Sequence, residues 1–526
     1  MKKVQGSSSV LFSAIKMALG TLGSRVLGLV RDILVAASFS TVITDAWLVA
    51  FRIPNLFRRL FGEGALTLSF LPILVKTRES GGPEAEKQLI NQLFSFLFLL
   101  LGFFSIICFI FAPQILHVIA GGEAFTSIAG KMAYSIRFLR IMSFFLLFIC
   151  MFAFFMALLN SRKKFFGAAF APALLNLSLI IACLLPDSIF EIPGEGLSWM
   201  ALIGGFLQMA FLVPAIKKLG LIPKLQSYVF SPEVKAVFKN STPAFLSMGV
   251  LQITNMVNVY FASTIENGAN SWIYYADRLL ELPLSLIAVS FASALLPSLS
   301  EFWARNDHEK FSLEFQKQLQ FTIFLALPAG VGLFFLGEDL VRLIFQRGEF
   351  SAYSAAQTAS VVQIYAFSLL IFASVRIVNV CFYASQKVWM PIGGTLSSLL
   401  LHISIVSYFV TNYGVKGLAI STAISGFFNL VVQFSLYQKE FRGFRWALFF
   451  KATLKSVLAA ALMAGVILLY FRLIEDQLVA DSRWNVLPLI LVCIVVYFIA
   501  ALILGTDELQ KLRNRLRRGR RPSKKC

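Results

Sequence analysis

Apolar stretches long enough to cross a lipid bilayer recur along this chain from one end to the other. A helix that spans the hydrocarbon core needs about 20 predominantly apolar residues in a row. Only 14% of the 526 residues are charged, whereas soluble domains average about 25%. The sequence therefore predicts an all-α integral membrane protein with about fourteen transmembrane helices, at 10–39, 43–76, 88–119, 127–160, 164–186, 196–216, 234–264, 270–300, 314–337, 353–384, 388–411, 414–437, 448–472 and 485–506.

The basic residues predict how the chain is oriented in the membrane. Much of the net charge of +20 lies in alternate hydrophilic connections and in the C-terminal tail KLRNRLRRGRRPSKK. The connections GGEAFTS, PDSIFEIPGEG and ENGAN contain no Lys or Arg, and only GEDLVRLIFQRGEF departs from this pattern, with Arg342 and Arg347. The positive-inside rule then puts both termini in the cytoplasm. This placement favours contact with anionic membrane lipids over nucleic-acid binding.

Cysteine and histidine residues give no sign of a metal site. Five of the six cysteines lie in apolar segments, Cys526 ends the chain, and none forms a C-x-x-C pair. The histidines His117, His308 and His402 are far apart in the sequence. We therefore expect no disulfide, no metal and no cofactor. No motif of a catalytic nucleophile or a P-loop indicates an enzyme.

An internal repeat divides most of the chain into two similar parts. WLVAFRIPNLFRRLFGEGALTLSFLP (47–72) and WIYYADRLLELPLSLIAVSFASALLP (272–297) both run from Trp to Pro at an offset of 225 positions, and LLNSRKK (158–164) matches FYASQKV (382–388) at nearly the same offset. Each copy covers six predicted helices, and six is even, so both copies point the same way through the membrane. We predict two parallel six-helix lobes with a cavity between them. The predicted domains are an N-lobe (1–220), a C-lobe (221–440), two extra C-terminal helices (441–506) and a basic cytoplasmic tail (507–526).

Charged residues inside the predicted spans are the candidate functional residues. RIPNLFRRLFGEGA (52–65) aligns with a plain span of the second copy, which predicts that it lies inside the membrane. The alternative is a cytoplasmic loop between two re-entrant pieces. Pro54, Gly62 and Gly64 are expected to bend or interrupt its helix. A charge at mid-bilayer costs about 2.5–3.5 kcal/mol on insertion scales, so these residues must face a wet cavity or pair with each other. The candidate binding groups are Arg25, Arg31, Arg52, Arg58, Arg59 and Arg278, and the candidate gating or charge-pairing groups are Asp32, Asp45, Glu63 and Asp277.

Two interpretations of these charges remain open. In the structural one, the carboxylates neutralise the arginines and lock helices together. In the functional one, the arginines form an anion site, because the first copy has more arginines than acids and guanidinium groups bind phosphate bidentately. Helical geometry puts Arg25 and Asp32 on one face, and it separates Arg58 from Arg59 by about 100°, so the sequence does not decide which of the two faces the cavity. Several converging arginines in a hydrophobic protein suit a lipid with a pyrophosphate group.

The chain resembles the MurJ family of bacterial lipid II flippases, within the multidrug/oligosaccharidyl-lipid/polysaccharide exporter superfamily. The resemblance is found in SRVLGLVRD (24–32), TDAWLVAFRIPNLFRRLFGEGA (44–65), SWIYYADRLLELP (271–283) and APALLN (171–176). It implies fourteen helices, a central cationic cavity, lipid II as the substrate and residence in the bacterial inner membrane. It also implies that the last two helices form a groove for the lipid tail.

The same resemblance assigns roles to individual residues. Its essential arginines fall on Arg25, Arg31, Arg58 and Arg278, and its conserved acids fall on Asp45 and Glu63. The family often has Lys at the position of Arg52. Some members bind sodium through the seventh helix, but here that span offers Asn255 and Asn258 and no carboxylate before Glu266, so we do not expect that site.

We hypothesise that a monomer transports its lipid by alternating access. Asp45, near the outer end of the second span, is expected to pair with an arginine when the outer gate is shut. The membrane potential, worth about 2.3 kcal/mol per charge per 100 mV, or an ion gradient would drive transport. The alternatives are a flippase for another lipid-linked oligosaccharide, such as an O-antigen or capsule precursor, a cation-coupled exporter of small molecules, and a membrane scaffold that transports nothing.

Overall fold

The computed structural model describes residues 7–62, 65–227, 230–441, 443–474, 483–506 and 508–509. Every regular element within these ranges is a helix, which confirms the predicted all-α class. The helices form two compact units. Unit 1 contains Met1–Ser271 and Arg347–Phe350, and unit 2 contains Trp272–Gln346 and Ser351–Cys526.

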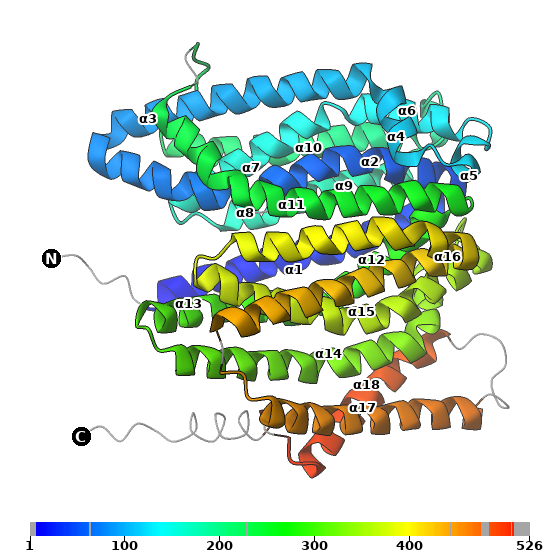
Figure 1. Ribbon diagram of the computed structural model, residues 1–526. Coiled ribbons are helices and arrows are strands. Elements are labelled where there is room, and N and C mark those ends of the chain that lie inside the picture. Colours follow the sequence, from blue (N-terminus) through cyan, green and yellow to red (C-terminus); the bar gives the residue numbers. More distant parts are fainter. Residues whose placement is uncertain are drawn as a thin grey trace. The chain divides into compact units, whose positions relative to one another are not determined.

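Unit 1 contains the first eleven α-helices (Figure 1). They are α1 (Ser7–Ser38), α2 (Thr41–Gly62), α3 (Ala65–Ile110), α4 (Ala112–Ala120), α5 (Glu123–Thr126), α6 (Lys131–Met142), α7 (Phe145–Ser161), α8 (Phe166–Phe170), α9 (Pro172–Leu184), α10 (Glu195–Lys218) and α11 (Pro232–Ile265), with a short 3₁₀ turn at Asp187–Ile189. Most side chains of α7 are buried, because α2, α3 and α10 all pack against it.

Unit 2 is built from the remaining helices. They are α12 (Ala269–Leu284), a π-helical turn at Ser285–Val289, α13 (Ser290–Ala304), α14 (His308–Phe345), α15 (Ala352–Ala384), α16 (Trp389–Phe441), α17 (Trp446–Ile474), a 3₁₀ turn at Arg483–Asn485 and α18 (Val486–Ile503). The first residues of α12, up to Ser271, belong to unit 1.

Two of the longest helical elements are each two arms joined at a glycine. Gly82 in α3 has φ 77° and ψ −173°, and Gly414 in α16 has φ 56° and ψ −133°. Side chains with a Cβ avoid such conformations, so glycine is the residue that can reverse the chain there. The two arms of each element run side by side (Figure 1). The predicted spans 388–411 and 414–437 therefore correspond to the arms of α16.

Nine helices within the described ranges are long and apolar enough to cross a membrane, or ten if the bent pair α6 and α7 forms one span. Asp45, Arg52, Arg58 and Arg59 exclude α2 from this set, because every 18-residue window of α2 contains at least three of them. The count of about fourteen spans stays a prediction. Pro54 lies inside α2, which is helical on both sides of it and ends at Gly62. Glu63 and Gly64 lie outside the described residues.

Residues with positive φ reproduce the internal repeat. Gly82 corresponds to Asn306, Lys163 to Gln386, Gly194 to Gly414 and Gly220 to Gly443, each pair separated by 220 to 224 positions. Left-handed residues mark tight chain reversals, so the same reversals recur in the same order in both copies. This agrees with the duplication inferred from the sequence. The boundaries of the predicted lobes stay a prediction.

Side chains of α3 bind the connection from α10 to α11 by accepting hydrogen bonds from its backbone N–H groups. Asn91 accepts a hydrogen bond from the Lys224 backbone N–H at 2.8 Å, and Ser95 Oγ accepts one from the Gln226 N–H at 2.8 Å. Because α11 also packs on α3, α4 and α5, it belongs with the first six predicted spans in unit 1.

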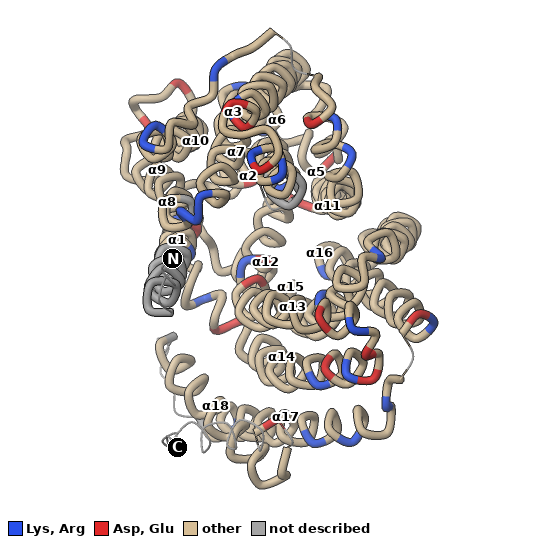
Figure 2. The backbone as a smooth tube through the Cα atoms, turned by 90° about the vertical axis from the view of Figure 1, so that its left-hand side faces the viewer, with Lys and Arg blue, Asp and Glu red and all other residues tan. Residues whose placement is uncertain are grey.

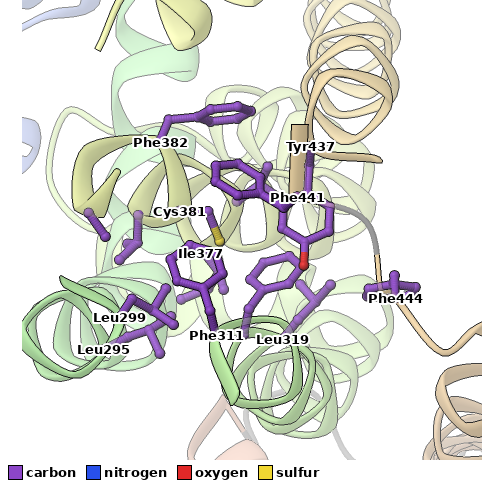
Figure 3. Packing of buried hydrophobic residues seen from close by; sticks show 14 of the residues in the cluster. Leu295, Leu299, Phe311, Leu319, Ile377, Cys381, Phe382, Tyr437, Phe441 and Phe444 are labelled. Atoms are coloured by element: carbon purple, nitrogen blue, oxygen red, sulfur yellow. The ribbon is translucent and has the colours of Figure 1, made fainter. Parts of the chain in front are cut away.

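The core of unit 2 is aromatic. Figure 3 shows Phe311, Cys381, Tyr437 and Phe441 gathered between α14, α15 and α16, and the Ser312 and Tyr437 hydroxyls lie 3.0 Å apart. The last two helices pack on α14. Pro328 has no N–H, which leaves the carbonyl of Phe324 without its helical partner. Tyr497 of α18 donates a hydrogen bond to that carbonyl at 2.6 Å, so the contact also explains why α18 packs at this point of α14.

Candidate anion-binding site and its charge partners

Arg31 of α1 is a buried arginine with its charge already compensated. It is 8% exposed. Its Nε and Nη2 donate to Asp32 Oδ1 at 3.0 and 2.6 Å, and its Nη1 donates to Asn176 Oδ1 of α9 at 2.9 Å. The Asn176 amide in turn donates to the Ser24 carbonyl at 2.9 Å. Gly28 faces the same amide, since a Cβ there would lie 3.4 Å from it. These contacts fix α1 against α9.

Arg25, nearly two turns earlier on α1, is exposed. The sequence placed Arg25 and Asp32 on one helix face, and the structure separates their environments, because Asp32 is only 4% exposed and accepts from its neighbour Arg31. Arg25 therefore retains access to solvent or to a ligand, which Arg31 does not.

The arginines of α2 are partly buried. Arg52 and Arg59 are seven residues apart and share a helix face, whereas Arg58 points about 100° away from Arg59. Arg58 Nε donates to Asn55 Oδ1 one turn earlier at 2.7 Å. All three side chains keep part of their surface accessible. Figure 2 marks basic and acidic positions on both α2 and α12.

In unit 2, Arg278 of α12 is held by its own helix. Its Nη2 donates to the Tyr274 hydroxyl at 2.8 Å, its Nη1 donates to Glu281 at 3.0 Å, and its guanidinium carbon lies 4.8 Å from the centre of the Tyr274 ring. The Arg278 side chain is 31% exposed. Asp277 beside it is half-buried. The tyrosine and the glutamate orient the guanidinium without enclosing it.

Among the described residues of unit 1, the network around Lys131 (Asp45, Lys131, Asn267 and Ser271) contains a fully buried ion pair. Lys131, the first residue of α6, is 0% exposed and donates to Asp45 Oδ2 at 2.7 Å and to Asn267 Oδ1 at 2.9 Å. Its ammonium lies 4.2 Å from the Phe125 ring centre. The other oxygen of Asp45 accepts from the backbone N–H and the hydroxyl of Ser271 at 2.8 and 2.9 Å. In this structure the cation paired with Asp45 is therefore Lys131, and the pairing of Asp45 with an arginine when the outer gate is shut stays a prediction.

The predicted site residues are distributed over both units. Unit 1 holds the charged candidates of α1 and α2, and unit 2 holds Asp277 and Arg278. Glu63 lies outside the described residues. The convergence of all these arginines on one cavity stays a prediction.

Sequence reasoning assigned no role to four residues of the Arg31 and Lys131 networks: Asn176, Lys131, Asn267 and Ser271. Asn176 is part of the APALLN motif but received no role. Lys131 lies within the predicted span 127–160. The signal that could have found Lys131 is its position. It is a lysine near the start of the span 127–160, on the side of the membrane where the connections otherwise lack Lys and Arg.

Within the described ranges, no three or more His, Cys, Asp or Glu side chains are grouped so that they could hold a metal ion.

Comparison with solved structures places this fold among multi-pass membrane transporters. An inward-facing multidrug resistance MATE family transporter of the MOP superfamily matches with a TM-score of 0.69 and 14% identity, over 82% of this chain and 98% of that chain. That likeness concerns the fold alone. A structure described as lipid II flippase MurJ in an inward closed conformation matches more fully, with a TM-score of 0.79 and 25% identity over 94% of this chain and 100% of that chain.

The chain belongs to the lipid II flippase MurJ family, whose model matches residues 34–488. A probable lipid II flippase MurJ of Bdellovibrio bacteriovorus is 39% identical over 96% of both chains. The lipid II flippase MurJ of Burkholderia cenocepacia is 32% identical over 87% of this chain and 89% of its own length. With this family and its many apolar helices, the protein is a multi-pass protein of the inner membrane.

Proposed function

We propose that this protein moves lipid II, the undecaprenyl-pyrophosphate-linked peptidoglycan precursor, from the inner to the outer leaflet of the cytoplasmic membrane. The observation on which this rests is the set of accessible arginines on helices of a flippase-family chain. Arg25 is exposed, and Arg52, Arg58, Arg59 and Arg278 are partly so. A pyrophosphate presents several oxygens to such forked donors, and guanidinium stays charged at any physiological pH.

In this proposal Arg31 has a different role from the other arginines. Because Asp32 neutralises it and Asn176 holds it against α9, it orients α1 and thereby places Arg25. Tyr274 and Glu281 set the position of Arg278 in the same sense. The lipid headgroup then contacts Arg25, Arg278 and the arginines of α2.

Transport proceeds by alternating access between the proposed N-lobe (1–220) and C-lobe (221–440). The headgroup enters the cavity from the cytoplasmic side, and the lipid tail stays in the bilayer along a groove formed by the proposed extra helices (441–506). The packing of α17 and α18 on α14 supports a rigid wall for this groove. Both termini, including the basic tail (507–526), lie in the cytoplasm.

No covalent step is required for this activity, and a monomer is sufficient. Outward movement of a negatively charged headgroup is favoured by an inside-negative potential, by about 2.3 kcal/mol per charge per 100 mV. The membrane potential is therefore the proposed driving force, with an ion gradient as the alternative.

The function is tested with purified protein in liposomes that contain lipid II. We expect wild-type protein to move lipid II between leaflets, and Arg25→Ala and Arg278→Ala to slow this at least tenfold while both variants still reach the membrane. The matched control is Lys217→Gln, a change of an exposed cation on α10. Equal flipping by all four proteins would contradict the arginine site, and selective flipping of an O-antigen precursor would assign a different substrate.

A further inference from the structure

Lys131 is buried far more completely than a lysine usually is. Its side chain has no exposed surface, and its partner Asp45 is 1% exposed. Burial of a charge is strongly unfavourable unless it is paired and hydrogen-bonded. Here each charge has its counter-charge and at least one further polar partner, Asn267 for the ammonium and Ser271 for the carboxylate. The enclosure is therefore stable only while all these partners stay in place.

The network joins parts of the chain that are distant in sequence. Asp45 lies in the first turns of α2, and Lys131 begins α6. Asn267 and Ser271 lie at the passage from α11 to α12, which contributes the N-terminal N–H of a helix to the carboxylate. A helix N-terminus favours a negative charge. Asp45 Oδ1 therefore faces the start of α12, and Lys131 binds the other carboxylate oxygen of Asp45.

A second tie connects the same two segments. The Gly122 N–H donates to Ser263 Oγ at 2.9 Å, and a Cβ at Gly122 would lie 2.5 Å from the Ser263 backbone. Segment 121–131 and segment 263–271 are therefore joined at two points, Gly122 with Ser263 and Lys131 with Asn267. Within the first segment, the Phe125 ring lies against the Lys131 ammonium.

The network belongs to one copy of the repeat. At the offset of 225 that aligns Trp47 with Trp272, the counterpart of Asp45 is Asn270 and that of Lys131 is Ala356. The second copy therefore has no charge pair at the matching positions, so this pair is a feature of the first copy alone.

We propose that Lys131 is a positioning residue for transport, which holds Asp45 against α12 and must release it when segment 263–271 separates from α2 and α6. This rests on the proposed function, because the separation is the outer opening of the alternating-access cycle. While Lys131 and Asp45 are in contact, their charges neutralise each other. When they separate, water solvates each charge. Lys131 thus sets how readily that end of the protein opens.

The test uses a reporter cysteine in full-length protein whose six native cysteines are replaced by alanine. Ala262→Cys places a thiol on α11 at a side chain that is 1% exposed, outside the network itself. Its rate of reaction with a membrane-impermeant maleimide is measured in liposomes. We expect Lys131→Met and Asp45→Asn to raise this rate about tenfold or more, because each leaves one buried partner uncompensated.

Two double variants separate positioning from simple burial. Asp45→Asn with Lys131→Gln restores a neutral hydrogen-bonded pair and should return labelling near the background rate. The exchange Asp45→Lys with Lys131→Asp should stay fast, because a lysine at position 45 would face the N–H and hydroxyl donors of Ser271. Protection by the exchanged pair would overturn the directed role of Lys131.

Labelling of Lys131→Met at the rate of the control Lys217→Gln would also overturn the proposal, even if the variant is less abundant. Lipid II flipping is measured on the same liposomes. Loss of flipping in the wild type would refute the proposed function and leave the labelling comparison valid, so the two failures are distinguishable.

Discussion

Removal of Asp32 provides a quantitative test of the proposal that Arg31 positions α1 whereas Arg25 binds the lipid headgroup. Asp32→Leu replaces the carboxylate with an apolar side chain and so removes the counter-charge that lies 2.6 Å from Arg31, an arginine that is 8% exposed. Breaking a buried ion pair by removing one partner costs about 3–5 kcal/mol, whereas replacing both partners with apolar residues is often nearly neutral. We therefore expect Asp32→Leu to destabilise unit 1 by about 3 kcal/mol, and Arg31→Met with Asp32→Leu to recover more than half of that loss.

The measurement is thermal unfolding in detergent micelles, followed by tryptophan fluorescence. The matched control is Asp187→Asn, which changes an exposed acid of the same unit and should leave Tm unchanged. Flipping is measured in parallel. Arg25→Ala should slow flipping at an unchanged Tm, and Asp32→Leu should lower both. Equal Tm values for Asp32→Leu and Asp187→Asn would refute the reasoning, as would a double variant less stable than Asp32→Leu.

Two further changes test the fold. Tyr497→Phe should lower Tm and increase hydrogen exchange in α18. It leaves the Phe324 carbonyl, whose helical partner is lost at Pro328, without a donor, at a cost of about 1–3 kcal/mol. Unchanged exchange in α18 would contradict this. Gly82→Ala should lower the free energy of unfolding by about 1–3 kcal/mol, because φ 77° with ψ −173° is essentially restricted to glycine. Gly102→Ala should not, because Gly102 lies in the same helix with open space around it. Equal effects at both positions would show that α3 does not depend on this reversal.

Much of the fold could be predicted because its signals are local. Hydropathy placed the helices at 234–264, 353–384 and 448–472, and the structure has Pro232–Ile265, Ala352–Ala384 and Trp446–Ile474. The repeat was also readable, since duplicated segments keep their residue spacing. The predicted span 43–76 includes Glu63 and Gly64, which lie outside the described residues, and the first arm of α3 continues past residue 76 to the reversal at Gly82.

The charged residues show where sequence reasoning ends. The sequence alone determined that this chain is a helical membrane protein with a duplicated core and that its arginines needed a wet cavity or partners, because the cost of a charge in hydrocarbon depends only on residue type and segment. The choice between those outcomes was made by the tertiary structure. Arg31 donates a hydrogen bond to Asn176, 145 positions away in the sequence, and Asp45 accepts one from Lys131, 86 positions away. A buried charge selects whichever partner the packed helices bring within about 3 Å, and that proximity exists only in the folded protein.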